Sequence, residues 1–290
     1  MSTIDADRLP DGEEPPLAVR VRTGTGPVQV RVWPSTDPDA ARLPLLLALH
    51  GWTDSGEVFA PLARALGRRW TVVAPDAPGH GGTPWPGGPE YVVKDHRATA
   101  LGVLDALPRV AGRRGRVVVL GHSLGAVTAT RVAAARPDVV VHLVLEEPAR
   151  ARPPRSRSAG ELLETVDEVR SLDERGRLTL LRTRTPDWPE DEYGPWLRSK
   201  LDLDRSHLDV PVDWGKPLRA LLAKVSCPVL LVHGDPERGG IVPGSAAERC
   251  AAACRGGCDV LALPAGHNPR REARDAFVTA VAETLRRYRD

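Results

Sequence analysis

Short apolar runs alternate with longer amphipathic stretches along most of the chain. Alternating apolar and polar positions at 17–22 and 28–33, separated by a Thr- and Gly-rich segment, predict an antiparallel hairpin. Continuous apolar runs, typical of strands covered on both faces, follow at 44–49, 70–74, 117–120, 139–145, 228–232 and 259–263. Helical patterns occur at 59–66, 91–110, 217–224, 245–253 and 271–288, and an alanine-rich helical stretch follows residue 125. This alternation predicts an α/β fold with a doubly wound parallel sheet.

The alternation stops after Glu146, Glu147 and Pro148. From about 149 to 213 the chain is rich in Arg, Pro and Trp, with helical stretches at 161–172 and 193–203, and we predict no strand there. We therefore expect a core domain in two parts, 17–148 and 216–290, with a helical cap at 149–215. The polar, acidic segment 1–16 is expected to be disordered.

Composition narrows the class of protein. The 290 residues are 41% hydrophobic, which is enough for a sizeable core, and their formal net charge of +2 favours neither nucleic acid nor a membrane surface as a partner. Residues 1–16 have no apolar core of the kind that secretory signals contain, and no stretch is apolar and long enough to span a bilayer. We therefore expect a cytoplasmic protein; its oligomeric state is left open.

Three of the four cysteines, Cys250, Cys254 and Cys258, are spaced four residues apart. This spacing matches no standard zinc pattern, and no pair of histidines lies nearby. A metal or disulfide site remains an alternative, but we expect buried or half-buried structural thiols and no bound metal.

The most informative segment is Gly121-His122-Ser123-Leu124-Gly125, which follows a buried strand and precedes a helix. In that context Gly-x-Ser-x-Gly predicts a nucleophile elbow, a sharp turn that presents the Ser123 hydroxyl above the sheet. Gly121 and Gly125 lack the β-carbons that would collide with the turn and the neighbouring strand.

With these elements in order, the sequence resembles the α/β-hydrolase superfamily from about residue 17 onwards. The resemblance implies a mostly parallel eight-stranded sheet, a helical cap after the sixth strand, and a catalytic triad in the order Ser, Asp or Glu, His. It rests on motifs after the third, fourth, fifth, seventh and eighth strands: His50-Gly51-Trp52, Asp76-x-x-Gly79-His80-Gly81, the elbow around Ser123, His233-Gly234-Asp235 and Gly266-His267.

A serine nucleophile needs a base, and His267 is the candidate, because it leaves the last strand at the same carboxyl edge of the sheet as Ser123. We expect His50 and His233 to brace loops instead. The acid of the triad is predicted to be Asp235, after the seventh strand, with Glu237 as the next choice. Glu146 or Glu147, after the sixth strand, would be a less common placement.

The resemblance also places the donors that stabilise a tetrahedral oxyanion. These are the backbone N–H groups of Trp52, in the His-Gly-Trp turn, and of Leu124, which follows the nucleophile. Four tryptophans predict an apolar cap wall facing an acyl or ring portion of the substrate: Trp85, Trp188, Trp196 and Trp214. Arginines at 150, 152, 155 and 157 are expected to form a solvated basic loop.

We therefore expect a serine hydrolase that cleaves an ester, thioester or lactone bond in a small molecule. Dehalogenases and epoxide hydrolases of this fold use a carboxylate nucleophile, which Ser123 excludes. The absence of a phosphate-binding glycine loop or a dinucleotide fingerprint implies no cofactor. A carbon–carbon bond hydrolase, a lyase or an acyltransferase with the same triad, and a small-molecule receptor of this fold, are the alternatives.

Overall fold

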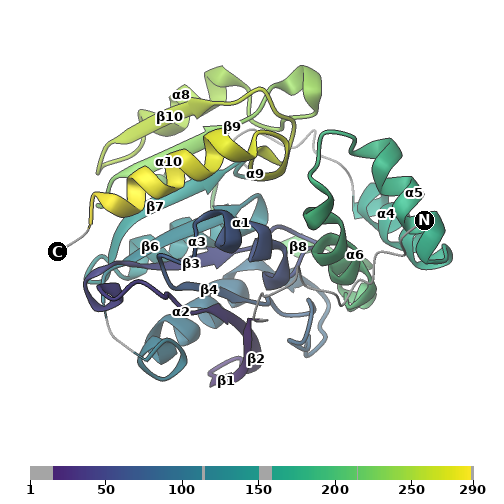
Figure 1. The fold of residues 1–290 in the computed structure, drawn as a ribbon, viewed down its shortest axis with the longest axis horizontal. Coiled ribbons are helices and arrows are strands. Elements are labelled where there is room, and N and C mark those ends of the chain that lie inside the picture. Colours follow the sequence, from purple (N-terminus) through teal and green to yellow (C-terminus); the bar gives the residue numbers. More distant parts are fainter. Residues whose placement is uncertain (1–15, 113–114, 150–158, 214, 289–290) are drawn as a thin grey trace.

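An eight-stranded sheet organises the molecule (Figure 1), and its strand order is β1-β2-β4-β3-β6-β7-β9-β10. The computed structural model describes residues 16–112, 115–149, 159–213 and 215–288. The pairs β1–β2 and β2–β4 are antiparallel, and every other pair is parallel. The strands, in chain order, are β1 (Leu17–Thr23), β2 (Gly26–Trp33), β3 (Leu45–Leu49), β4 (Val72–Pro75), β6 (Val117–His122), β7 (Val140–Glu146), β9 (Val229–His233) and β10 (Cys258–Ala262). The predicted doubly wound, mostly parallel sheet is confirmed.

Helices cover both faces of this sheet. On one face lie α2 (Val93–Val110), α3 (Leu124–Ala135), α7 (Leu218–Leu222) and α8 (Gly244–Ala251), and on the other lie α1 (Ala60–Ala65) and α10 (Arg274–Arg286). All five residues of β3 are apolar because helices cover both of its faces. Leu45, Leu47 and Leu49 pack in the hydrophobic core beneath α2, α3, α7 and α8, whereas Leu46 and Ala48 pack in the core beneath α1 and α10. Each fully buried leucine contributes about 1.5–3 kcal/mol, so a strand with two covered faces has no position for a polar side chain.

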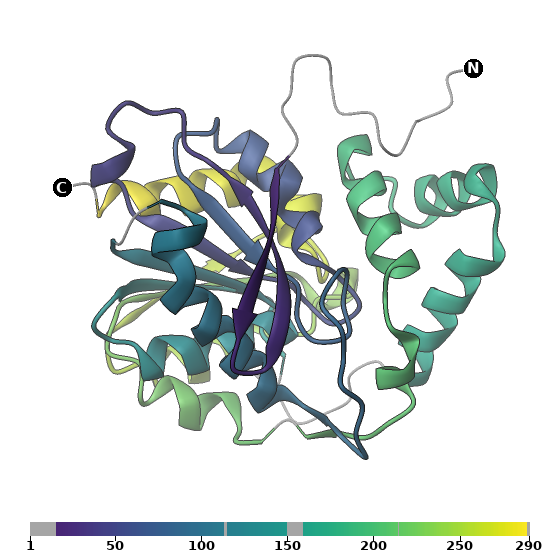
Figure 2. The same cartoon turned by 90° about the horizontal axis from the view of Figure 1, so that it is seen from below.

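The chain between β7 and α7 forms a separate group of helices beside the sheet (Figure 2). Its helices are α4 (Ala159–Ser171), α5 (Glu174–Arg184) and α6 (Tyr193–Leu201). We refer to the described residues 159–213 as the helical insertion. The helix α5 was not predicted, because arginines obscure its apolar face. Asp173 begins it by accepting a hydrogen bond from the Gly176 N–H at 2.7 Å.

Three local expectations are wrong. A two-residue strand, β8 (Val212–Asp213), lies in the segment for which no strand was predicted, and it pairs with β5 (Tyr91–Val92). The helix predicted at 91–110 consequently begins at Val93. A two-residue ladder is too short to produce a periodic pattern. The last helix is also interrupted, because Ala273 has non-helical dihedrals (φ −130°, ψ 49°) between α9 (Pro269–Glu272) and α10.

Short 3-10 helices complete the described chain: η1 (Ala40–Arg42), η2 (Gly56–Phe59), η3 (Glu190–Glu192), η4 (Arg205–Leu208) and η5 (Pro236–Arg238). Three expectations fall outside the described residues. They concern the disorder expected of segment 1–16, of which only Pro16 is described, the basic loop expected at the arginines 150, 152, 155 and 157, and the role expected of Trp214. Within the described part of the chain, no helix is both long and apolar enough to cross a membrane.

Candidate active site

Ser123 occupies a sharp turn between β6 and α3, as the Gly-x-Ser-x-Gly motif predicts. Its backbone has φ 52° and ψ −112°, a conformation that residues other than glycine rarely adopt. Its N–H donates to the Glu146 carbonyl at 3.0 Å. A β-carbon on Gly121 would lie 2.3 Å from the Gly125 carbonyl oxygen, and one on Gly125 would lie 2.1 Å from the Leu49 carbonyl oxygen. The expected need for both glycines is therefore confirmed.

The turn after β3 lies directly beside the elbow. A β-carbon on Gly51 would lie 3.4 Å from the Ser123 Cβ. His50 fixes this approach, because its Nδ1–H donates to the Gly51 carbonyl at 2.8 Å while its Nε2 accepts the Ala77 N–H at 2.9 Å. His50 thus braces the loop, as expected, and His233 does the same by donating from Nδ1 to the Gly234 carbonyl at 2.9 Å. The turn that carries Trp52 is held against the nucleophile.

His267 lies in the loop that follows β10, and its side chain is 28% exposed. His122 holds this loop, because its Nε2–H donates to the His267 carbonyl at 2.9 Å and the two rings lie 4.8 Å apart. Burial lowers the pKa of His122 well below its usual value, so this ring stays neutral. The described residues include no hydrogen bond between the Ser123 hydroxyl and the His267 ring. Such bonds often tighten only when substrate is bound.

The carboxylate beside His267 is Glu147, at 3.2 Å from Oε2 to Nδ1. Glu147 follows β7 directly, has φ 45°, and is completely buried. Its Oε1 accepts the Gly234 N–H at 2.8 Å, and its Oε2 also accepts the Ile241 N–H. Because a carboxylate only accepts, the His267 Nδ1 carries the proton and Nε2 presents its lone pair.

The structure therefore corrects the prediction that Asp235 pairs with His267. The Asp235 side chain turns back onto its own loop, where it accepts the Glu237 N–H at 2.9 Å and begins η5. Glu237 itself is exposed on that helix. Glu146, the other alternative, accepts two hydrogen bonds from Arg270, from its backbone N–H at 2.8 Å and from its guanidinium at 2.9 Å. Of these four carboxylates, Glu147 is the one that the described structure places against the His267 ring.

Buried charges surround this arrangement, and the sequence reasoning missed them. Asp54, in the turn after β3, lies within 3.4 Å of Arg270 and 3.3 Å of Arg271, which follow His267 by three and four residues. Lys200 of the insertion joins Asp54 at 2.8 Å, and Glu192 of η3 joins Arg271 at 3.3 Å. Nearby cations hold the pKa of Asp54 well below its usual value despite its burial. The adjacent arginines after His267 were the available sequence clue, since arginine is buried only when it is paired.

Two further groups of residues are structural. His80 and His207 lie 4.7 Å apart between ring centroids, with Tyr91 4.5 Å from His207, where the insertion meets the core. Trp188 and Trp196 pack against each other, 6.2 Å apart, inside the insertion, whereas Trp85 packs against the cluster that contains Tyr91 and Leu124. The cysteines are all free, with Cys250 buried and Cys254 and Cys258 half-buried, as expected of structural thiols. Across the described ranges, no cluster of His, Cys, Asp and Glu could hold a metal ion.

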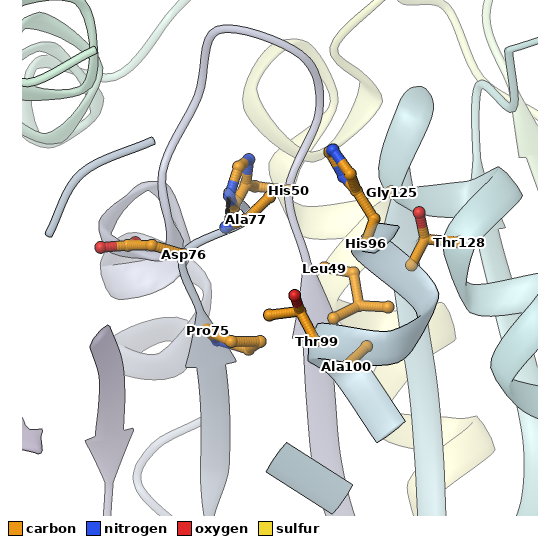
Figure 3. Close-up of a pocket in the computed structure, with 10 residues that line it drawn as sticks. All are labelled: Leu49, His50, Pro75, Asp76, Ala77, His96, Thr99, Ala100, Gly125 and Thr128. Carbon is orange, nitrogen blue, oxygen red and sulfur yellow. Dashed lines mark hydrogen bonds between the residues drawn. The ribbon is translucent and has the colours of Figure 1, made fainter. Parts of the chain in front are cut away.

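A small cavity lies beneath the turn after β3 (Figure 3). It is lined by His50, Asp76, His96, Thr99 and Thr128, among others, and its volume is about 20 Å³. Burial lowers the pKa of His96 to about 3, so a neutral ring lines this space. The cavity has room for about one water molecule, which is too small for an acyl group. It is therefore a feature of the core and not the substrate pocket.

Comparisons with known proteins identify the family of the chain. Residues 45–280 match the model of the Alpha/beta hydrolase family, which covers most of the chain, and the chain belongs to that family. It is similar to lipase LipV of Mycobacterium tuberculosis, with 42% identity over 106 residues, but this match spans only 37% of the chain and 38% of the lipase. It is also similar to the pimeloyl-[acyl-carrier protein] methyl ester esterase of Nitrosomonas europaea, with 30% identity over 220 residues, 71% of this chain and 81% of that one.

The sheet and helices also resemble those of solved structures. The thioesterase domain from the curacin biosynthetic pathway aligns with a TM-score of 0.70 over 93% of this chain and 100% of that domain. The identity is 21%, so this likeness concerns the fold.

Proposed function

We propose that the protein is a serine hydrolase that cleaves an ester, thioester or lactone bond in a small molecule through an acyl-enzyme. The observation that carries this proposal is that Ser123, strained at φ 52° on its elbow, and the His267–Glu147 pair follow strands that end at the same edge of the sheet. A strained serine beside an oriented histidine is the arrangement that nucleophilic acyl transfer needs. Membership in the α/β-hydrolase family and similarity to a lipase and a methyl ester esterase support it.

Each residue has a defined task in this mechanism. The Ser123 Oγ attacks the carbonyl carbon while the His267 Nε2 accepts its proton, and Glu147 stabilises the imidazolium that forms. The negative charge that develops on the carbonyl oxygen is bound by the backbone N–H groups of Trp52 and Leu124. His267 then gives its proton to the leaving oxygen or sulfur, which departs and leaves the acyl group on Ser123.

Deacylation repeats these steps with water as the nucleophile. His267 removes a proton from the water molecule, the resulting hydroxide attacks the acyl carbon, and the proton returns to the Ser123 oxygen as the acid product leaves. Every proton passes through the His267 Nε2, so the reaction needs no metal or cofactor. We propose that the insertion acts as a cap over this site and that the substrate presents an apolar acyl or ring portion to it.

Hydrolysis of p-nitrophenyl esters, from acetyl to decanoyl, tests the proposal when Ser123→Ala is assayed beside the parent. We expect turnover that depends on Ser123 and has an optimum in chain length, which measures the acyl pocket. Reaction that persists in Ser123→Ala would contradict the assignment of the nucleophile. A stoichiometric burst without turnover would favour an acyltransferase or a receptor of this fold, and no reaction with any ester would favour a lyase or a carbon–carbon bond hydrolase.

A further inference from the structure

The turn after β3 contains a strained residue. The Asp54 N–H donates to the Gly51 carbonyl at 3.2 Å, which closes a tight turn with Trp52 and Thr53 at its centre. Thr53 has φ 67°, in the left-handed region that a β-branched residue adopts only when its surroundings hold it there. Trp52, whose N–H is proposed to bind the oxyanion, precedes Thr53. The Gly51 carbonyl that accepts the Asp54 N–H shares a planar peptide group with the Trp52 N–H, so contacts that hold Thr53 and Asp54 in the closed turn also restrain that N–H.

Two side chains hold Thr53, one from each part of the molecule. In the core, the His80 Nε2 accepts the Thr53 N–H at 3.3 Å. From α6 of the insertion, the Lys200 Nζ donates to the Thr53 carbonyl at 2.7 Å. Lys200 is only 3% exposed, and its other two acceptors are the Asp54 carboxylate at 2.8 Å and the Ser199 hydroxyl at 3.2 Å. All three ammonium donors are therefore satisfied, and two of their three acceptors belong to the turn.

We infer that Lys200 is a positioning residue that the insertion supplies to the oxyanion turn, so that the site is complete only when the insertion is docked. This inference rests on the proposed function for its catalytic consequence, but the contact itself does not depend on it. Asp54 strengthens the connection, because its other oxygen lies 3.4 Å from Arg270 and 3.3 Å from Arg271 in the segment that follows His267. The turn is thus tied to both the insertion and the histidine loop.

The charges around Lys200 give this contact a pH dependence. Asp54 faces the ammonium from the turn, Arg270 and Arg271 face it from α9, and Arg170 of α4 donates to the Lys200 carbonyl at 3.0 Å. Burial lowers the pKa of Lys200 to about 8, although Asp54 opposes this shift. Above that pH the amine loses one donor and its charge, and its hold on the turn weakens. Turnover by the parent enzyme should therefore decline above about pH 8.

The test compares Lys200→Met with Arg198→Met. Methionine keeps most of the apolar stem and removes every donor, while Asp54 retains both arginines. Arg198 lies on the same helix and also joins the insertion to the core, but through a 2.7 Å hydrogen bond to Glu57 of η2, which lies outside the turn. We expect Lys200→Met to lower kcat by about 30-fold or more with KM changed less than about threefold, because loss of an oxyanion donor costs about 10²–10³ in kcat. Arg198→Met should stay within about threefold of the parent.

A second readout separates positioning from partial unfolding. An alkyl boronic acid forms a tetrahedral adduct with the serine and occupies the oxyanion site, so its inhibition constant should rise in Lys200→Met by about the factor by which kcat/KM falls. If misfolding merely lowered the fraction of active molecules, kcat would fall and the inhibition constant would not change. That second pattern, or an alkaline decline above pH 8 that persists in Lys200→Met, would overturn the inference.

Hydrogen exchange tests the contact without any substrate. In Lys200→Met the backbone amides of the segment 51–56 should exchange at least tenfold faster than in the parent and in Arg198→Met. Unchanged exchange would overturn the inference even if the parent hydrolysed esters. If the parent showed no Ser123-dependent turnover, the proposed function would fail, while exchange would still decide the role of Lys200. Lys200→Gln, which keeps shorter donors, replaces Lys200→Met if that variant does not fold.

Discussion

Replacing Glu147 with glutamine tests the corrected assignment of the catalytic acid. The change keeps the shape of the side chain and removes its charge. In the parent, three donors converge on the two carboxylate oxygens: Gly234 N–H on Oε1, and Ile241 N–H and His267 Nδ1–H on Oε2. An amide offers only one oxygen, so its NH₂ group must face at least one of these donors.

The cost of that mismatch can be worked out for each orientation of the amide. If its oxygen faces His267, the NH₂ group meets the Gly234 N–H, and a buried donor without a partner costs about 1–3 kcal/mol of stability. The amide then no longer stabilises imidazolium. If the NH₂ group faces His267, the ring is forced into the tautomer whose Nε2 cannot accept the serine proton. A change of this kind lowers kcat by about 10⁴ in a serine protease, or about 5.4 kcal/mol at 1.36 kcal/mol per tenfold. We expect a loss of about 10³–10⁴ here.

The assay is steady-state hydrolysis of the best p-nitrophenyl ester, with active enzyme counted by fluorophosphonate titration and folding checked by thermal melting. The matched control is Asp235→Asn, whose parent carboxylate accepts the Glu237 N–H at the start of η5. This control should keep kcat within about threefold and lose at most about 1–2 kcal/mol of stability, as for a helix cap. If Asp235→Asn lost more than 100-fold and Glu147→Gln stayed within tenfold, the identification of the acid by geometry would be wrong.

Two further predictions concern folding. Burial lowers the pKa of His207 to about 4 from 6.5, so between these pH values the folded state binds fewer protons than the unfolded state. The free energy of unfolding should therefore decrease as the pH is lowered from 6.5 to 4, by up to about 3 kcal/mol for this ring alone. Urea midpoints measured between pH 7 and 4.5 check this, and a midpoint that stayed constant would refute it, while His207→Phe should flatten the dependence. Gly125→Ala should destabilise the fold by at least about 1–3 kcal/mol, because its β-carbon would lie 2.1 Å from the Leu49 carbonyl oxygen. Gly244→Ala, which meets nothing within 4 Å, is its control, and equal stability of both variants in urea would contradict the close approach of β3 and α3.

The fold was predictable because its signals are local. A run such as 45–49 must be a strand covered on both faces, and six such runs with helices between them leave few arrangements other than a parallel sheet. The positions of Ser123 and His267 at one edge followed from the same order, since parallel strands share a carboxyl end. What could not be predicted was short or depended on side-chain direction, such as the two-residue strand β8 and the arginine-rich helix α5.

The partner of His267 and the buried ion pairs could not be predicted from the sequence either, because they depend on the paths of loops and on contacts between distant residues. Asp235 and Glu147 both follow strands that end at the correct edge, and only the path of each loop decides which carboxylate reaches His267. Asp235 is used within its own loop, whereas Glu147 is turned inward by a backbone with φ 45°. Lys200 follows Arg198 and Ser199 in α6, and nothing in that run of polar residues indicates that the lysine is buried. Its partner Asp54 is 146 residues away, and no local pattern connects them.

The proposed mechanism depends on Ser123 being a nucleophile that His267 activates at the elbow. Labelling with a fluorophosphonate, followed by peptide mapping of the modified residue, tests it most directly in the parent, in Ser123→Ala and in His267→Ala. We expect rapid stoichiometric labelling of Ser123 in the parent, none in Ser123→Ala, and labelling slowed by at least about 10²-fold in His267→Ala, since general base catalysis contributes about 10²–10⁴. Labelling at another residue, or at Ser123 with an equal rate in His267→Ala, would contradict it.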